Sequence, residues 1–102
     1  MANYIFAYHG GQMPETPEEG QKIMAAWGAW FEGLGSAIVD GGNPAGASKT
    51  VTAGGVEDGG GANPISGYSL VEADSIDAAC EMAKGCPILD HGSVEVAEAM
   101  EM

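Results

Sequence analysis

A helix start followed by a single apolar stripe, in residues 16–34, constrains the fold of this chain more than any other feature. Thr16 can act as the N-cap, Pro17 has the fixed φ that suits the first helical position, and Glu19 completes a capping box. Apolar side chains then follow the helical spacing i, i+4, i+7, i+8, i+11, at Ile23, Trp27, Trp30, Phe31 and Leu34. The pattern predicts a helix over residues 17–34 whose aromatic stripe packs in the core rather than forming a ligand box.

Four segments have the character of β-strands. In the first, residues 3–9, alternate side chains project to opposite faces: Tyr4, Phe6 and Tyr8 to one, Ile5, Ala7 and His9 to the other. Both faces are largely apolar, so this strand is expected inside a sheet that is covered on both sides. Three further strands are expected at residues 36–40, 67–73 and 93–98.

A second helix is expected over residues 75–85, with Asp74 or Ser75 as its cap. Its buried stripe is predicted to comprise Ile76, Ala79, Cys80 and Ala83. The order is therefore β-α-β-β-α-β, the split βαβ or ferredoxin-like arrangement. We expect an α+β fold with one domain over residues 1–102, in which a four-stranded antiparallel sheet of strand order 4-1-3-2 carries both helices on one face.

The connection from residue 41 to residue 64 is rich in glycine and contains one expected strand fragment, residues 49–52. A connection of this length is often a lid or a binding loop, and a mobile surface loop is the equal alternative. Residues 57–61 superficially resemble a cation-binding loop. They lack the alternating ligands and the terminal Glu of a calcium loop, so no metal site is expected.

The charge of the chain excludes several classes of partner. Fifteen acidic residues against three lysines and no arginine give a formal charge of −12. This balance argues against nucleic acid and against anionic membranes, and the lack of arginine argues against a phosphorylated substrate. No secretory or membrane-spanning segment is found, and Cys80 and Cys86 have no zinc-ligand spacing, so a cytoplasmic protein with reduced thiols is expected.

A homodimer is expected from the first strand. Two helices can cover only one face of a sheet, and an uncovered apolar face is larger than monomers usually tolerate. A second copy of the chain would cover it.

His9 is the expected catalytic residue. It ends the first strand beside a Gly-Gly turn, and a histidine can act as a base or an acid near neutral pH. Asp40, at the end of the second strand, is the expected partner that orients it. The alternative is that His9 only donates a hydrogen bond to a loop carbonyl. His91 is expected to be a solvated turn residue.

Several motifs spread over nearly the whole chain carry a family resemblance. They are Tyr8-His9-Gly10, Trp30-Phe31-x-x-Leu34-Gly35, Val39-Asp40-Gly41-Gly42, residues 66–75 (SGYSLVEADS), residues 83–87 (AKGCP) and residues 92–96 (GSVEV). On this ordered set the chain resembles the YCII-related family, including its DGPF-containing branch, although Gly60-Gly61 replaces the Pro-Phe of that motif. The resemblance implies a dimeric α+β barrel with a pocket between the sheets, and acid–base chemistry by a His–Asp pair.

Two functions follow as expectations. The first is cofactor-free proton transfer, of the isomerase or lyase type, by His9 and an aspartate on a small, neutral or cationic, partly aromatic molecule. Tyr8, Tyr68 and Asp58 are the expected ligand-binding residues. The second is a non-enzymatic module for ligand binding or oligomerisation, with His9 bonded to backbone.

Overall fold

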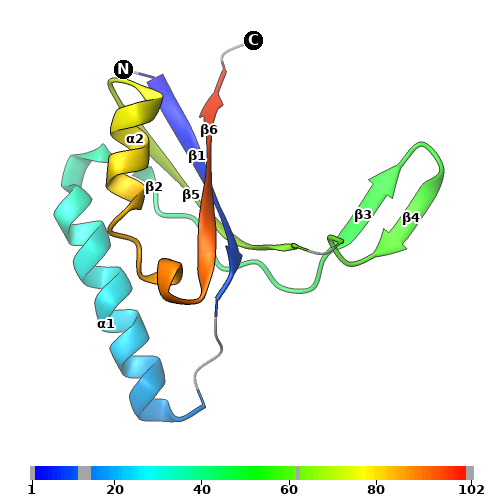
Figure 1. Cartoon of the computed structure of the whole chain (residues 1–102), viewed down its shortest axis with the longest axis horizontal. Coiled ribbons are helices and arrows are strands. Elements are labelled where there is room, and N and C mark those ends of the chain that lie inside the picture. Colours follow the sequence, from blue (N-terminus) through cyan, green and yellow to red (C-terminus); the bar gives the residue numbers. More distant parts are fainter. Residues whose placement is uncertain (1, 12–14, 62, 101–102) are drawn as a thin grey trace.

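A computed structural model describes residues 2–11, 15–61 and 63–100 of the chain. Its elements alternate strands and helices, with a hairpin between them (Figure 1). In chain order they are β1 (Ala2–Gly10), α1 (Pro17–Leu34), β2 (Ile38–Asp40), β3 (Lys49–Thr52), β4 (Gly55–Asp58), β5 (Ile65–Ala73), α2 (Ile76–Ala83) and β6 (Gly92–Ala99). Short 3₁₀ turns, Gly35–Ala37 and Pro87–Asp90, precede β2 and β6.

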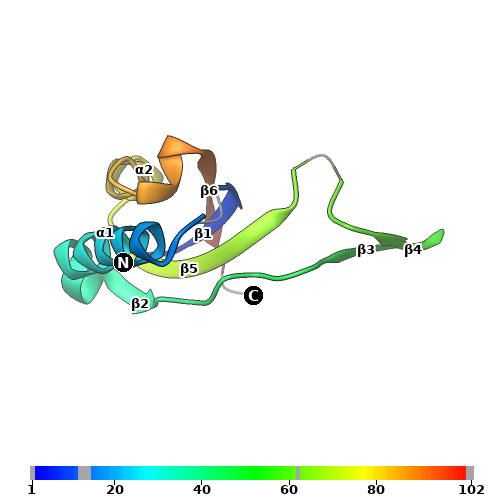
Figure 2. The ribbon, with the colours of Figure 1, turned by 90° about the horizontal axis from the view of Figure 1, so that it is seen from below.

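The main sheet has four antiparallel strands in the order β2-β5-β1-β6. With the separate hairpin β3–β4 set aside, this is the predicted strand order 4-1-3-2, and the α+β prediction is confirmed. The central strand β1 pairs with β5 on one side and with β6 on the other. Both helices lie on the same face of the sheet (Figure 2).

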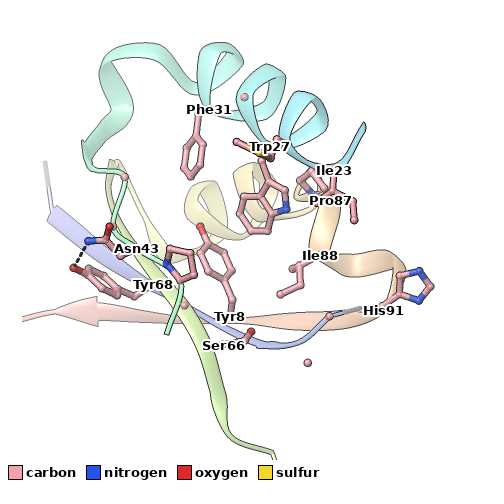
Figure 3. Close-up of a pocket in the computed structure, with 18 of the residues that line it drawn as sticks. Tyr8, Ile23, Trp27, Phe31, Asn43, Ser66, Tyr68, Pro87, Ile88 and His91 are labelled. Atoms are coloured by element: carbon pink, nitrogen blue, oxygen red, sulfur yellow. Dashed lines mark hydrogen bonds between the residues drawn. The ribbon is translucent and has the colours of Figure 1, made fainter. Parts of the chain in front are cut away.

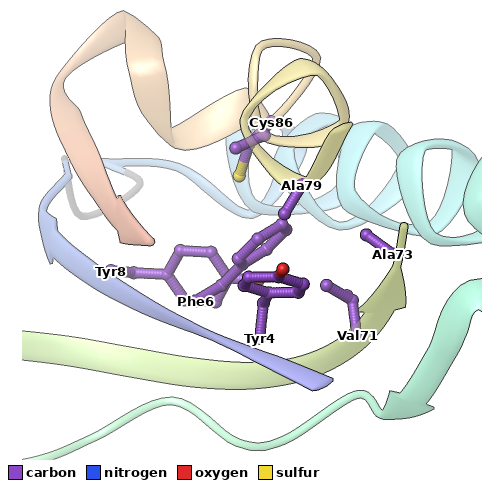
Figure 4. Packing of buried hydrophobic residues seen from close by; sticks show 8 residues of the cluster. Tyr4, Phe6, Tyr8, Val71, Ala73, Ala79 and Cys86 are labelled. Atoms are coloured by element: carbon purple, nitrogen blue, oxygen red, sulfur yellow. The ribbon is translucent and has the colours of Figure 1, made fainter. Parts of the chain in front are cut away.

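The core lies between that face and the helices. Tyr4, Phe6 and Tyr8 of β1 are buried, together with Val71 of β5 and Ala79 of α2 (Figure 4). Trp27, Trp30 and Leu34 of the α1 stripe pack onto them, as predicted, whereas Ile23 is 38% exposed and Phe31 contacts the two tryptophan rings instead of the buried cluster. Because Trp30 stacks on Phe6 with ring centroids 6.1 Å apart, the helix is held over the middle of β1. The Trp30 Nε1 also donates to the carbonyl of Met82, which ties α1 to α2 at 3.0 Å.

Both helix starts have their predicted caps. Thr16 Oγ1 accepts from the N–H of Glu19 at 3.1 Å, and Glu19 Oε2 reaches back to the N–H of Glu15. At α2 the cap is Ser75 rather than Asp74, because Ser75 Oγ accepts from the N–H of Ala78.

The predicted stripe of α2 is only half right. Ala79 and Ala83 are buried, but Ile76 is 48% exposed and Cys80 is exposed, so their predicted burial is wrong. The physical reason is the rotation of this helix, whose core-facing side consists of Ala79 and Ala83 flanked by Ala78 and Met82, so that Ile76 and Cys80 lie off that side. The buried thiol is Cys86, just beyond the helix, and burial raises its pKa to about 11.

The other face of the sheet is not covered within the chain. Its middle carries small and apolar side chains that the strand register places opposite one another, with the carboxylate of Glu95 opposite Ala7, and we call it the open face: Ile5, Ala7, Tyr68, Leu70, Glu95 and Ala97. Ile5 is 40% exposed and Tyr68 is 42% exposed. The prediction that β1 lies inside the sheet is therefore confirmed, while its second face is open in the single chain.

The glycine-rich connection contains one strand more than predicted. The fragment at residues 49–52 forms β3 as expected, but it pairs with β4, which the prediction missed. The two strands make a hairpin that projects away from the main sheet (Figures 1 and 2). The base of this hairpin is closed by a 2.8 Å hydrogen bond from the N–H of Gly59 to the carbonyl of Ser48.

Candidate functional site

A pocket of about 720 Å³ lies on the helix side of the sheet, where β1 ends. Three segments that are distant in sequence form its walls: α1, the loop after β2, and the 3₁₀ turn before β6 (Figure 3). This volume falls within the range of small-molecule sites, which is about 300–1,000 Å³. The principal side chains around it are Tyr8, Trp27, Phe31, Pro44, Pro87 and Ile88.

The inner wall of the pocket is aromatic. Tyr8 from β1 and Trp27 from α1 meet edge to face, with ring centroids 5.0 Å apart. Phe31, one helical turn beyond Trp27, lies 5.9 Å from that indole. Burial raises the pKa of Tyr8 to about 12, so its hydroxyl stays protonated at neutral pH. This wall therefore offers flat apolar surfaces and no charge.

The loop Gly41–Pro44 forms the opposite wall and is fixed by hydrogen bonds to β5. Ser69 Oγ donates to the carbonyl of Gly41 at 2.7 Å, and the N–H of Tyr68 donates to the carbonyl of Asn43 at 3.2 Å. At Gly42 the backbone has φ +72, and a Cβ there would lie 1.7 Å from the Tyr68 carbonyl oxygen. Only glycine allows this close approach, so the loop wall depends on that residue.

The expected partner of His9, Asp40, performs a different task. Its Oδ1 accepts from the N–H of Gly42 at 2.8 Å, a turn that starts the loop wall of the pocket. Asp40 lies on β2, which is separated from β1 by β5. The structure therefore does not bring His9 and Asp40 into hydrogen-bond contact, and Asp40 borders the candidate site only through the loop that it supports.

His9 itself faces the other side of the sheet and does not line the pocket. Its side chain is 14% exposed. Nδ1 lies 3.0 Å from the carbonyl oxygen of Asn63 and 3.3 Å from that of Pro64, and Nε2 lies 3.1 Å from Glu95 Oε1. Both ring nitrogens thus face acceptors, and a neutral ring can donate to only one of them. The carboxylate that contacts His9 is Glu95 of β6, which sequence reasoning missed.

Of the three expected ligand-binding residues, two border the pocket. Tyr8 does so from the helix side. Tyr68 does so where its backbone meets Gly42 of the loop, while its side chain lies on the open face and its hydroxyl accepts from Asn43 Nδ2 at 3.4 Å (Figure 3). The third, Asp58, lies at the base of the projecting hairpin and pairs with Lys49 at 3.0 Å. The structure therefore separates Asp58 from the other two.

Among the described residues that line the pocket, Asp90 at the rim is the only one with a formal charge. Asp90 and His91 line the opening, and the ring of His91 points away from the centre, as expected of a solvated turn residue (Figure 3). Lysine is absent from the lining residues that the structure describes. Within the same part of the chain, no cluster of three or more His, Cys, Asp or Glu side chains could hold a metal ion.

The sequence predicts a binding loop as one of two alternatives for residues 41–64, of which Gly41–Pro44 lines the pocket, but the 3₁₀ turn Pro87–Asp90 was missed. A signal was present: Gly41-Gly42-Asn43-Pro44 and Cys86-Pro87 both stop an element at the same end of the predicted sheet. Trp27 and Phe31 are predicted for the core; Trp27 packs against it, Phe31 packs on Trp27, and both line the pocket.

Comparisons with known proteins do not assign a function to this site. No protein-family model matches the chain, and no curated protein is significantly similar to it. Among the residues that the structure describes, no helix has the length and apolar character needed to cross a membrane.

Proposed function

We propose that this protein binds a small, uncharged or cationic organic molecule with an aromatic body in the pocket between α1 and the loop Gly41–Pro44. One observation carries this proposal, namely the 720 Å³ pocket with Tyr8, Trp27 and Phe31 on its wall. Faces and edges of aromatic rings bind other rings by offset or edge contacts, and their faces attract organic cations.

The charges around the pocket select against anions. Asp90 is at the rim, lysine is absent from the described lining, and the whole chain carries −12. A carboxylate or phosphate entering this site would meet repulsion and find no cationic partner. A neutral or positively charged ligand meets neither obstacle.

The test compares three probes of similar ring size and different charge: phenol, phenyltrimethylammonium and benzoate. The indole N–H signal of Trp27 in a ¹⁵N NMR titration reports the pocket, and that of Trp30, which bonds to Met82 outside it, is the internal control. Phenol and phenyltrimethylammonium are expected to shift Trp27 and to leave Trp30 nearly unchanged, while benzoate shifts neither. No shift at Trp27 with any probe would refute the proposal, as would equal binding of benzoate.

A pair of glycine variants tests the position of the site. Gly28 lines the pocket and Gly33 does not, and a Cβ at either meets no atom within 4 Å. Gly28→Leu is expected to fill the opening and to weaken binding of phenol at least tenfold. Gly33→Leu adds the same side chain to the same helix and should bind like the natural protein.

A second candidate function is cofactor-free proton transfer by His9, which its 3.1 Å contact with Glu95 favours. Here Glu95 replaces Asp40 as the carboxylate that orients the ring. The same NMR titration separates the two candidates, because a substrate at His9 shifts the ring signals of His9 rather than Trp27. Nδ1 of His9 lies against the carbonyl oxygens of Asn63 and Pro64, and both contacts must break before that nitrogen can accept a proton. The geometry therefore favours ligand binding over catalysis.

We also propose an assembly and a family for this chain. We propose a homodimer in which a second copy covers the open face, since Ile5 and Tyr68 are each about two-fifths exposed there. A light-scattering mass near 10 kDa at micromolar concentration would refute it. Membership of the YCII-related family is supported by the α+β fold and its sheet order. A cytoplasmic location is supported by Cys80 and Cys86, which are both free.

A further inference from the structure

The hairpin of β3 and β4, residues 49–58, extends from the body of the molecule as an arm. All eight residues of its two strands are exposed. It shares no backbone pairing with the main sheet, since the two strands form a sheet of their own. An isolated two-stranded hairpin is at best marginally stable in water, so such an arm gains from a partner surface.

The whole chain also exposes more surface than a compact protein of its mass. A compact protein of 10.3 kDa exposes about 5,400 Å², whereas this chain exposes 6970 Å², an excess of roughly 1,600 Å². Its radius of gyration is 14.7 Å, against about 12.8 Å for a compact domain of this length. The excess area is about twice the ~800 Å² that each partner contributes to a standard interface.

One face of the arm carries a valine pair near its tip, with the Lys49–Asp58 ion pair at the base of the same face. Val51 lies directly opposite Val56, and side chains alternate between the faces of a strand, so the two valines share a face. They are 74% and 62% exposed. Thr50 and Thr52 project from the other face. The arm thus presents a valine pair near its tip, with threonines behind it.

The same chain carries the surface that this pair fits. The open face of the main sheet exposes Ile5 and Tyr68, and the arm projects away from the sheet instead of folding over it (Figures 1 and 2). The two unpaired apolar surfaces are therefore on one molecule but not in contact. Two copies related by a two-fold axis can each place their arm on the partner's open face. In such a symmetric dimer neither arm is left without a partner surface.

We infer that the arm is a dimer clasp whose Val51 and Val56 pack on the open face of a second copy. This inference rests on the proposed homodimer and adds the element that holds it. A second copy is favoured over an unrelated protein because the arm and its complement lie on the same chain, and because the excess area is sufficient for an interface.

The test is a matched pair of charge insertions, Val51→Asp and Thr52→Asp. The two positions are adjacent on β3, receive the same charge and face opposite sides of the arm. An aspartate at 52 can still accept the bond that Thr52 Oγ1 accepts from the N–H of Gly54. Sedimentation or light scattering over a concentration series is expected to show a dimer Kd raised roughly tenfold or more by Val51→Asp, and changed little by Thr52→Asp.

A second variant guards against misfolding of the arm. Replacing residues 50–57 by Asn-Gly leaves Lys49 and Asp58 joined by a two-residue turn, and is expected to weaken the dimer at least as much. A dimer unaffected by both Val51→Asp and this excision would overturn the clasp while leaving the sheet-face dimer intact. A natural protein that stays monomeric would overturn both. Binding of phenol to the pocket is read separately and survives either result.

Discussion

The hydroxyl of Tyr8 donates a 2.7 Å hydrogen bond to Ser69 Oγ, and Ser69 Oγ in turn donates to the carbonyl of Gly41 at 2.7 Å. This chain of two bonds joins the central strand, its neighbour β5 and the loop wall of the pocket. Both side chains are buried, and the bond between them is shielded from water, while the bond to Gly41 is partly shielded. The position of the pocket wall therefore depends on polar groups inside the core.

Removing the Ser69 hydroxyl, which takes part in both hydrogen bonds, should lower the free energy of unfolding more than removing the Tyr8 hydroxyl. In Ser69→Ala, the Tyr8 hydroxyl and the Gly41 carbonyl both lose their partner, and the free energy of unfolding is expected to fall by about 1–3 kcal/mol. In Tyr8→Phe, Ser69 still donates to Gly41, and the expected loss is about 0.5–1.5 kcal/mol. Urea denaturation of both variants and of the double variant measures the difference. Equal losses in the two single variants that add independently in the double variant would contradict this coupling of the two hydrogen bonds.

Stability is expected to decline in alkali, starting above pH 9. Burial raises the pKa of Cys86 from 9.0 to about 11 and that of Tyr8 from 10.0 to about 12. Between these values the unfolded chain loses protons that the folded chain retains, so the free energy of unfolding falls as pH rises. Urea midpoints at pH 8, 10 and 11 measure the decline. Tyr8→Phe should flatten the part above pH 10, and a natural protein with no decline would contradict the prediction.

Two glycines of the pocket should respond oppositely to alanine. Gly42→Ala places a Cβ against the Tyr68 carbonyl at a left-handed backbone position, and is expected to cost roughly 1–3 kcal/mol for the backbone alone, with further loss from the displaced loop. Gly28→Ala, in α1, meets no atom within 4 Å and should stabilise the helix by up to about 1 kcal/mol. Thermal unfolding of each variant checks both signs, and a tolerated Gly42→Ala would show that the loop is not fixed.

The two thiols should differ in reactivity. Cys80 is exposed, while Cys86 is 3% exposed and its pKa is raised to about 11 by burial. A thiol reagent at pH 8 is expected to modify one cysteine per folded chain and two after unfolding in urea. Cys80→Ser should abolish the fast modification. Rapid labelling of two thiols in the folded protein would contradict the burial of Cys86.

The fold was predictable because its signals are local. The capping box at Thr16, the aromatic stripe behind it and the alternation in β1 each need only a few adjacent residues, and together they imply the order of elements. What failed depends on neighbours in space. The pairing of β3 with β4 is not evident in a glycine-rich stretch, and Cys80 has the helical spacing of a core residue although α2 turns Ala78 and Met82 toward the core instead.

The site was predicted less well for the same reason. His9 was paired with Asp40, although the predicted order 4-1-3-2 already places the strand of Asp40 at an edge, beyond a third strand. That order puts the last strand beside the first, where Glu95 meets His9. The pocket could not be found from one segment, because α1, the loop after β2 and the turn at Pro87 become neighbours only after the chain folds.

The central position of β1 governs when this chain can fold during synthesis. Its strand partners are β5 and β6, and the register pairs Asn3 with Glu72 and with Ala99. β1 therefore gains its first backbone partner only when β5 is present and its second only with β6, and loop closure over such separations makes folding slow. Until β6 leaves the ribosome, the aromatic side chains of β1 lack a completed sheet. The apolar surface of Tyr4, Phe6 and Tyr8 therefore stays open to other chains until the distant strands join, which makes the slow steps of folding the ones most exposed to aggregation.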